Sequence, residues 1–149
     1  PVPDDVPECI LNLIDTMDKS SLCIERGRTG TFYMALGVDG IWKMQYNITN
    51  DKITFKKITD GNKTFYRIGL GIGPDGDFLR GLKSIYAAAI IDGVYGFYRS
   101  DDDGASWLRI NNDNQMFGQI DCICGDSRSF GRFYIATGSR GLLYGEPIQ

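Results

Sequence analysis

One pattern recurs three times in this chain: TFYMALGVDGIWKM at residues 31–44, SIYAAAIIDGVYGFYRS at residues 84–100 and RFYIATGSRGLLYG at residues 132–145. Each copy has a tyrosine inside an apolar segment, then a turn, then a glycine that opens a second segment. The tyrosines are Tyr33, Tyr86 and Tyr134, spaced by 53 and then 48 residues. That spacing is close to the length of one four-stranded β-propeller blade. The repeat therefore predicts an all-β fold built from propeller blades.

The strands of each predicted blade follow from this pattern. The tyrosine strand is the second of a blade and the glycine-led strand is the third. The fourth strands are predicted at residues 53–58 and 106–110, and the first strands of the following blades at residues 64–70 and 119–124. Residues 9–14 are also predicted to form a strand. The blades then span about residues 9–60, 61–113 and 114–146.

The predicted blades form an incomplete propeller arc. The third copy of the pattern has no fourth strand, which gives about 2.75 four-stranded antiparallel blades, whereas a closed propeller needs at least about four. An open arc exposes strand edges and an unfinished core. We therefore expect residues 1–149 to be a portion of one propeller domain. Its partner would be the remainder of that propeller, from the same precursor or from other chains.

Composition excludes several function classes. Lys and Arg number 16 against 19 Asp and Glu, so the chain lacks the concentrated basic face that nucleic acid binding needs. No apolar run approaches the roughly 18 residues that span a membrane. Histidine is absent, which rules out Ser-His-Asp triads and the usual zinc sites within this chain. We expect no cofactor and no metal.

The four cysteines leave their pairing open. They are Cys9, Cys23, Cys122 and Cys124, which allow three full sets of disulfides. Cys9 and Cys23 could bridge neighbouring strands. Cys122 and Cys124 lie two apart in one predicted strand, so they point to one face and reach each other poorly. The other interpretation is free, buried thiols.

Two N-glycosylation sequons favour a secreted, extracellular glycoprotein. They begin at Asn47 (Asn-Ile-Thr) and at Asn62 (Asn-Lys-Thr), both in polar, turn-like stretches. Such positions keep an attached sugar in solvent.

The turn after the third strand of the middle blade matches the Asp-box (BNR repeat) pattern S-x-D-x-G-x-[ST]-W. Its residues are Ser100, Asp102, Gly104, Ser106 and Trp107. We expect a structural role, in which Asp102 accepts backbone N–H bonds, Gly104 adopts positive φ and Trp107 packs the turn onto the blade. The three consecutive aspartates do not form an EF-hand calcium loop, because Arg99 occupies a position that needs an oxygen ligand.

The sequence around and beyond this box resembles the end of glycoside hydrolase family 74, the xyloglucanases. The resemblance rests on FYRSDDDGASWLRINND at residues 97–113, QMFG at 115–118 and GDSRSFGRFYIATGSRGLLYG at 125–145. It covers about residues 94–146, the C-terminal blades only, while the upstream residues share just the blade rhythm. The chain departs from the family pattern at Asn112, usually Asp, and at Ser127, usually Pro.

The resemblance implies two propellers, each of about seven blades, that enclose a cleft and cut the β-1,4-glucan backbone of xyloglucan with inversion. Such a reaction needs one carboxylic acid and one carboxylate base. Neither family aspartate has a counterpart here, so no catalytic residue is assigned. Four other aspartates are interpreted as turn residues: Asp39, Asp75, Asp77 and Asp92. Trp42 and Tyr46 are weak candidates for stacking on sugar rings, since strand aromatics in propellers more often pack in the core.

Two functions remain open at this stage. The first is the C-terminal propeller segment of a secreted, xyloglucan-active hydrolase of the endo-β-1,4-glucanase type, with a structural role in polysaccharide degradation. The second is a non-catalytic extracellular Asp-box propeller that serves as a scaffold or carbohydrate-binding module. The residues upstream of this chain would discriminate between them, because only the enzyme needs both cleft aspartates.

Overall fold

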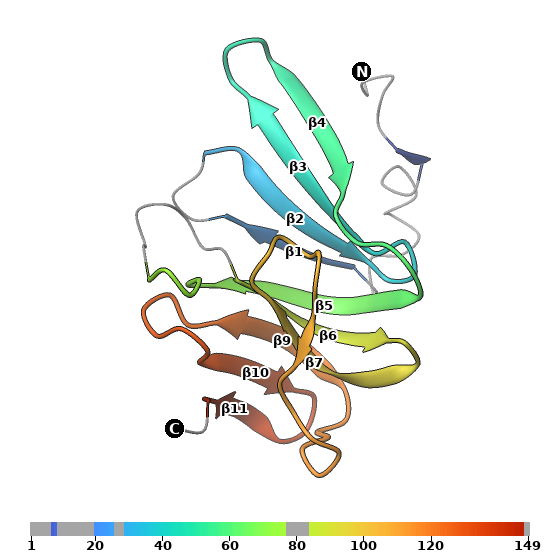
Figure 1. The fold of residues 1–149 in the computed structure, drawn as a ribbon, viewed down its shortest axis with the longest axis vertical. Coiled ribbons are helices and arrows are strands. Elements are labelled where there is room, and N and C mark those ends of the chain that lie inside the picture. The colour runs from blue at the N-terminus through green and yellow to red at the C-terminus, as the bar shows by residue number, and fades with distance from the viewer. Residues whose placement is uncertain (1–6, 9–19, 26–28, 77–83, 148–149) are drawn as a thin grey trace.

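Three antiparallel β-sheets follow one another along the chain (Figure 1) in the computed structural model, which describes residues 7–8, 20–25, 29–76 and 84–147. The first sheet contains β1 (Ser20–Ile24), β2 (Thr31–Leu36), β3 (Ile41–Asn47) and β4 (Lys52–Lys57). The second contains β5 (Lys63–Gly71), β6 (Ser84–Ile91), β7 (Val94–Ser100) and β8 (Leu108–Arg109). The third contains β9 (Ile120–Gly125), β10 (Phe133–Thr137) and β11 (Gly141–Gly145). No helix in the described part of the chain could cross a membrane.

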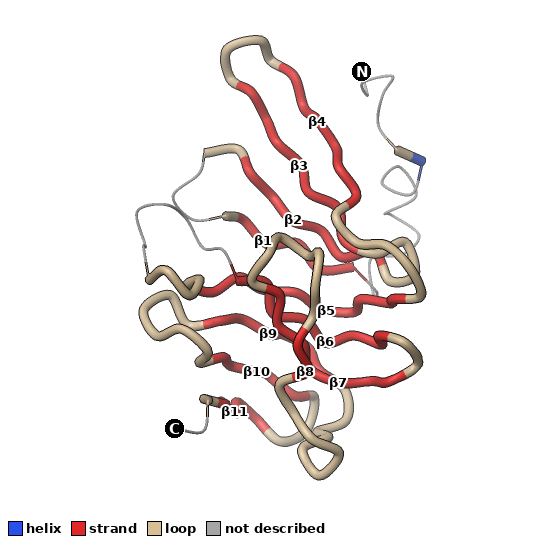
Figure 2. The backbone as a smooth tube through the Cα atoms, in the orientation of Figure 1, coloured by secondary structure: helices blue, strands red, loops and turns tan. Residues whose placement is uncertain are grey.

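Each sheet is a meander in which every strand pairs with the next strand in sequence (Figure 2). The predicted all-β arc of propeller blades is therefore confirmed, and the arc is open. Two details differ from the prediction. The fourth strand of the second sheet covers only Leu108–Arg109, because the preceding residues are used in the Asp-box hairpin. The first strand of the first sheet is Ser20–Ile24, while the strand expected at residues 9–14 lies outside the described residues.

The sequence repeat corresponds to the pairing of the second strand with the third strand, which recurs in all three sheets. In every sheet, an alanine on the second strand lies opposite the apolar residue that follows the repeated glycine (Gly40, Gly96 or Gly141). The pairs are Ala35 with Ile41, Ala88 with Phe97 and Ala136 with Leu142. The turn between β6 and β7 is Asp92-Gly93, and both residues have positive φ. A two-residue turn of this kind matches the right-handed twist of the strands it joins.

The hydrophobic core lies between the sheets rather than within any one of them. One cluster joins the first and second sheets through residues such as Tyr33, Ile41 and Phe65. A second cluster joins the second and third sheets through Tyr86, Phe97 and Phe133, among others. Each sheet is thus one layer of a stack, as expected for neighbouring propeller blades.

The first strands of the sheets, β1, β5 and β9, contact one another in order. The approach of β5 to β9 is close because glycines line it. A Cβ added at Gly71 would lie 2.7 Å from the Cα of Gly125, and one at Gly69 would overlap the carbonyl oxygen of Ile123. The absence of side chains at these positions therefore lets the second and third sheets meet backbone to backbone.

Two apolar sheet faces remain without a neighbouring sheet among the described residues. The first-sheet outer face contains Leu22, Ile24, Trp42, Met44 and Tyr46, and the third-sheet outer face contains Cys122, Cys124, Tyr134, Leu142 and Tyr144. Several of these side chains are strongly exposed, Leu142 at 71% and Ile24 at 62%. The interpretation of the cysteines as buried thiols is therefore wrong for Cys122 and Cys124, which are free and exposed, while Cys23 is free and half-buried. Cys9 lies outside the described residues.

Candidate functional site

The five Asp-box residues come together in the hairpin between β7 and β8. The carboxylate of Asp102 accepts hydrogen bonds from the Ser106 backbone N–H at 2.8 Å, the Ser106 hydroxyl at 2.5 Å and the Ser100 hydroxyl at 2.8 Å. Ser100 Oγ in turn accepts the N–H of Gly104 at 2.9 Å. Gly104 has a φ of 93°, a conformation that costs other residues far more than glycine. The hairpin is thus held by its own side chains.

These bonds also set the ionisation of Asp102. Partial burial works to raise its pKa, but the hydrogen bonds from Ser106 and Ser100 outweigh burial and hold the pKa below its ordinary value. A carboxyl group with a lowered pKa gives up its proton readily and is a poor general acid near neutral pH. The electrostatics of Asp102 therefore favour a structural role.

Trp107 ties the hairpin to the core between the first two sheets. Its indole Nε1–H donates to the carbonyl oxygen of Gly104 at 3.0 Å. Its ring lies 4.9 Å from that of Phe65, tilted by 47°, in the range of favourable aromatic pairs. Gly104 itself faces the first sheet, since a Cβ there would lie 3.1 Å from the Ile58 carbonyl oxygen. The hairpin consequently reaches from the second sheet onto the first.

Asp103 completes this contact in a way that the sequence pattern does not specify. Its carboxylate accepts from the Tyr33 hydroxyl at 2.8 Å and from Lys43 Nζ at 2.8 and 3.1 Å. We call these three residues the inter-sheet clasp. Lys43 also lies over the Tyr33 ring, 5.0 Å from its centre. Burial and the bond to Asp103 raise the pKa of Tyr33 well above its ordinary value, so the hydroxyl keeps its proton and remains a donor.

The weak sugar-stacking candidates lie on the first-sheet outer face. Trp42 is half-buried in β3, opposite Met34 and Lys57. Tyr46 is 39% exposed and donates its hydroxyl to Asp51 at 2.9 Å. Both side chains lie on the first-sheet outer face, which no other sheet covers among the described residues.

The remaining predicted positions lie apart from this hairpin. Asn47, at the end of β3, and Asn62, just before β5, are both exposed, and the Asn47 side-chain oxygen accepts the Thr49 N–H at 2.9 Å. The exposed aspartates Asp39, Asp75 and Asp92 are in turns or at their edges, whereas Asp77 lies outside the described residues. Among the described residues no three His, Cys, Asp or Glu side chains come close enough to hold a metal ion.

A groove runs between the outer strands of the second and third sheets. One part, of about 170 Å³, is lined by Phe97, Ile110, Phe117 and Leu143 together with polar residues that include Asn111 and Glu146. Another part, of about 350 Å³, is lined by Arg99, Phe130 and Pro147 among others. Ile110, Phe133 and Glu146 border both parts, so the two form one groove beside the edge of the third sheet.

Comparison with known proteins gives consistent results in sequence and in fold. A xyloglucanase from a Paenibacillus species is 39% identical over 112 residues, which cover 75% of this chain and 10% of that protein. A xyloglucanase from Acetivibrio thermocellus is 46% identical over 88 residues, which cover 58% of this chain and 10% of that protein. The crystal structure of a GH74 xyloglucanase from Xanthomonas campestris superposes with a TM-score of 0.71 at 28% identity, covering 99% of this chain and 18% of that one. No protein-family model matches the chain.

The alignments cover most of this chain but only a small part of each relative. The chain spans about a tenth of the length of the curated relatives named above. The matched part of this chain is nevertheless long, and the superposition extends over nearly all of it.

Proposed function

Because this chain is a partial region of glycoside hydrolase family 74, we propose that it is a structural segment of a secreted, xyloglucan-active enzyme of the endo-β-1,4-glucanase type. One observation carries the proposal: the carboxylate of the Asp-box hairpin is engaged within the hairpin itself. Asp103 is likewise engaged, by the inter-sheet clasp. These groups stabilise the stacking of sheets and are not arranged as the acid and base that inverting hydrolysis requires.

The partner that fits this role is the remainder of the same propeller. The two outer faces present apolar side chains in the same arrangement that the second sheet uses to contact its neighbours on both sides. Exposed apolar surface of this kind generally marks an interface. We propose that further blades pack on both outer faces, and that carbohydrate is bound by residues beyond this chain.

The first prediction is that the isolated 149-residue chain does not hydrolyse xyloglucan. Catalysis by inversion needs two positioned carboxyl groups, and the proposal assigns both to other parts of the parent protein. The measurement is the release of reducing sugar from xyloglucan, with a far-UV circular dichroism spectrum to monitor the β-structure of the same sample.

The matched control is the parent polypeptide, assayed at the same molar concentration. Activity in the parent and none in the chain supports the proposal. Hydrolysis by the chain above the heat-denatured blank would contradict the structural role. An inactive parent that still binds xyloglucan would instead favour the non-catalytic, carbohydrate-binding alternative.

Secretion leads to a second prediction, that Asn47 and Asn62 carry glycans in the native material. Both side chains are exposed and lie outside the two core clusters, so a glycan would remain in solvent. The measurement is a glycopeptide map after proteolysis, with glycosidase-treated material as the control. Two unmodified sites would remove the support that the sequons give to secretion through a glycosylating pathway.

A further inference from the structure

Tyr66 and Tyr95 form a pair of half-buried rings on the second sheet. Their ring centres lie 6.4 Å apart and their planes are tilted by 55°. Tyr95 lies opposite Ile90 in the pairing of β7 with β6, and Ile90 is half-buried as well. Tyr66 belongs to β5, on the other side of β6. The two tyrosines and Ile90 therefore lie on three adjacent strands, and we call them the tyrosine platform.

A β-bulge accounts for the position of Tyr66. The register of β5 with β6 shifts between Phe65 and Arg67, and Tyr66 has no partner residue on β6. An extra residue of this kind re-aims its own side chain. The neighbouring Phe65 packs in the core between the first and second sheets, whereas the Tyr66 ring contacts Tyr95. The bulge thus keeps one aromatic ring out of the core and places it beside a second one.

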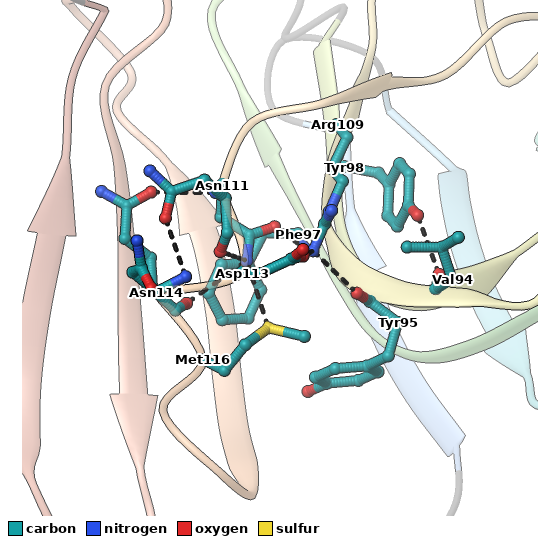
Figure 3. Close-up of polar contacts among 11 residues, drawn as sticks. Val94, Tyr95, Phe97, Tyr98, Arg109, Asn111, Asp113, Asn114 and Met116 are labelled. Carbon is teal, nitrogen blue, oxygen red and sulfur yellow. Dashed lines mark hydrogen bonds and ion pairs between the residues drawn. The ribbon is translucent and has the colours of Figure 1, made fainter.

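The hydroxyl groups of the platform differ from those of other tyrosines. Four tyrosine hydroxyls each donate to a protein oxygen: Tyr33, Tyr46, Tyr98 and Tyr134. The hydroxyls of Tyr66 and Tyr95 make no hydrogen bond to a described residue, and neither is a buried unpaired atom. The Tyr95 carbonyl oxygen accepts from Arg109 at 3.3 Å, and its ring points away from that contact (Figure 3). The platform therefore combines apolar ring faces with free polar groups.

Asn62 lies on the same face of the second sheet as the platform. Its carbonyl oxygen accepts the Asp92 N–H at 3.3 Å. This bond continues the ladder in which Thr64 lies opposite Ile90. Side chains two residues apart along a strand share a face, so Asn62 shares the face of Thr64 and Ile90. Tyr95 is two strands across and two residues along from Asn62, about 12 Å between their backbones.

The Asn62 side chain is free to carry a glycan. It is exposed and makes no hydrogen bond to a described residue, and it begins the sequon Asn-Lys-Thr. An N-glycan begins with N-acetylglucosamine rings, which have apolar C–H faces and acetyl methyl groups. Polarised C–H groups pack favourably on the electron-rich face of an aromatic ring. Tyrosine hydroxyls donate to and accept from the polar groups of a sugar.

We propose that the first sugars of an N-glycan on Asn62 stack on the tyrosine platform and bond to its hydroxyls, while the outer sugars remain in solvent. The inference rests on the secretion that the proposed function includes, and it adds the surface to which the glycan binds. Attachment forms a bond between Asn62 Nδ2 and C1 of the first sugar. The donor is a glycosyl diphosphate, whose C1–O bond breaks as the diphosphate leaves and the amide gives up a proton.

The experiment measures the tyrosine ring signals by NMR. The chain is produced with ¹³C-labelled tyrosine in a yeast host that glycosylates secreted proteins, and is compared with the variant Asn62→Gln. The Tyr66 and Tyr95 signals are expected to differ between the two proteins. The exposed tyrosines Tyr46 and Tyr144 serve as internal references, and their signals are expected to remain unchanged.

Two controls isolate the effect of the glycan on Asn62. Asn47→Gln removes the other predicted glycan and is expected to leave the platform signals unchanged, because Asn47 belongs to the first sheet. The unmodified chain and Asn62→Gln, both produced in a bacterial host without glycosylation, are expected to give the same platform signals. This second comparison excludes a direct effect of the substitution.

A thermodynamic cycle tests whether the sugars contact the rings. Loss of the Asn62 glycan is expected to raise the equilibrium constant for unfolding about fivefold, by analogy with one favourable aromatic pair. In Tyr95→Ala the same loss is expected to change this constant less than about twofold, because one side of the platform is missing. Tyr95→Phe retains the ring and is expected to keep most of the effect. The measurement is urea denaturation of each protein with and without the glycan.

Three results would overturn the proposal. The first is an unmodified Asn62 in the glycosylating host, and the second is the same platform signals in the glycosylated chain and in Asn62→Gln. The third is a glycan-free chain whose platform signals shift with cellohexaose although the attached glycan leaves them unchanged, since the occupant would then be a glucan. A parent protein inactive on xyloglucan, combined with shifted platform signals, would contradict the proposed activity and leave this inference standing. An active parent with unshifted signals would do the reverse.

Discussion

Gly69→Ala is expected to destabilise the protein by about 3 kcal/mol, because the new methyl group has no space between the second and third sheets. A Cβ at this position would overlap the carbonyl oxygen of Ile123 and lie 2.7 Å from the Cα of Cys124. Both obstacles are backbone atoms of β9, which cannot turn away as a flexible side chain could. The whole strand must therefore move, and the contact of β5 with β9 must open. The measurement is the free energy of unfolding from urea denaturation.

The matched control is Gly138→Ala. Gly138 follows β10 and lacks a positive φ, as Gly69 does, but a Cβ there would meet only ordinary contacts, the nearest at 3.7 Å from an Asp121 oxygen. This substitution is expected to change stability by no more than about 0.5 kcal/mol. If both variants unfold at the same urea concentration, the close backbone approach of the sheets does not limit stability.

The order of the strands could be predicted from the sequence because blade architecture is repeated locally. Each tyrosine strand and glycine-led strand are joined by a short turn, so their pairing needs no information from distant parts of the chain. The repeat also predicted a third sheet without a fourth strand, and three strands form that sheet in the described part of the chain. The prediction is less accurate next to the Asp-box. A strand was predicted at residues 106–110, but the structure has it only at Leu108–Arg109, because the Ser106 N–H is bonded to Asp102 in the hairpin.

The contacts between sheets could not be predicted in the same way. Asp103 occupies a variable position of the Asp-box pattern, yet its carboxylate bonds Tyr33, 70 residues away in sequence. Nothing in the local pattern distinguishes Asp103 from Asp101, whose carboxylate bonds Ser84 and Arg99 within its own sheet. Likewise, the location of Trp42 on an outer face depends on strand register, because shifting a strand by one residue would turn its side chain to the other face.

Trp107→Ala is expected to lower the free energy of unfolding by about 3 kcal/mol, the low end of the range for truncating a large aromatic residue. The indole contributes in two ways. Its ring fills the space beside Phe65 in the core between the first and second sheets, and its Nε1–H satisfies the carbonyl oxygen of Gly104. Truncation leaves a void and an unpaired acceptor in the turn. It also loosens the hairpin that carries Asp103 to the inter-sheet clasp.

A phenylalanine at the same position separates these contributions. Trp107→Phe retains an aromatic ring against Phe65 but has no donor for Gly104, so it is expected to cost about 1 kcal/mol, the net value of one hydrogen bond. The measurement for both variants is urea denaturation, and for the parent protein also the kinetics of xyloglucan hydrolysis. A structural role requires that the melting temperature falls while KM and the kcat calculated per folded molecule remain unchanged. Unchanged melting with altered kinetics in Trp107→Ala would instead place the indole in contact with substrate.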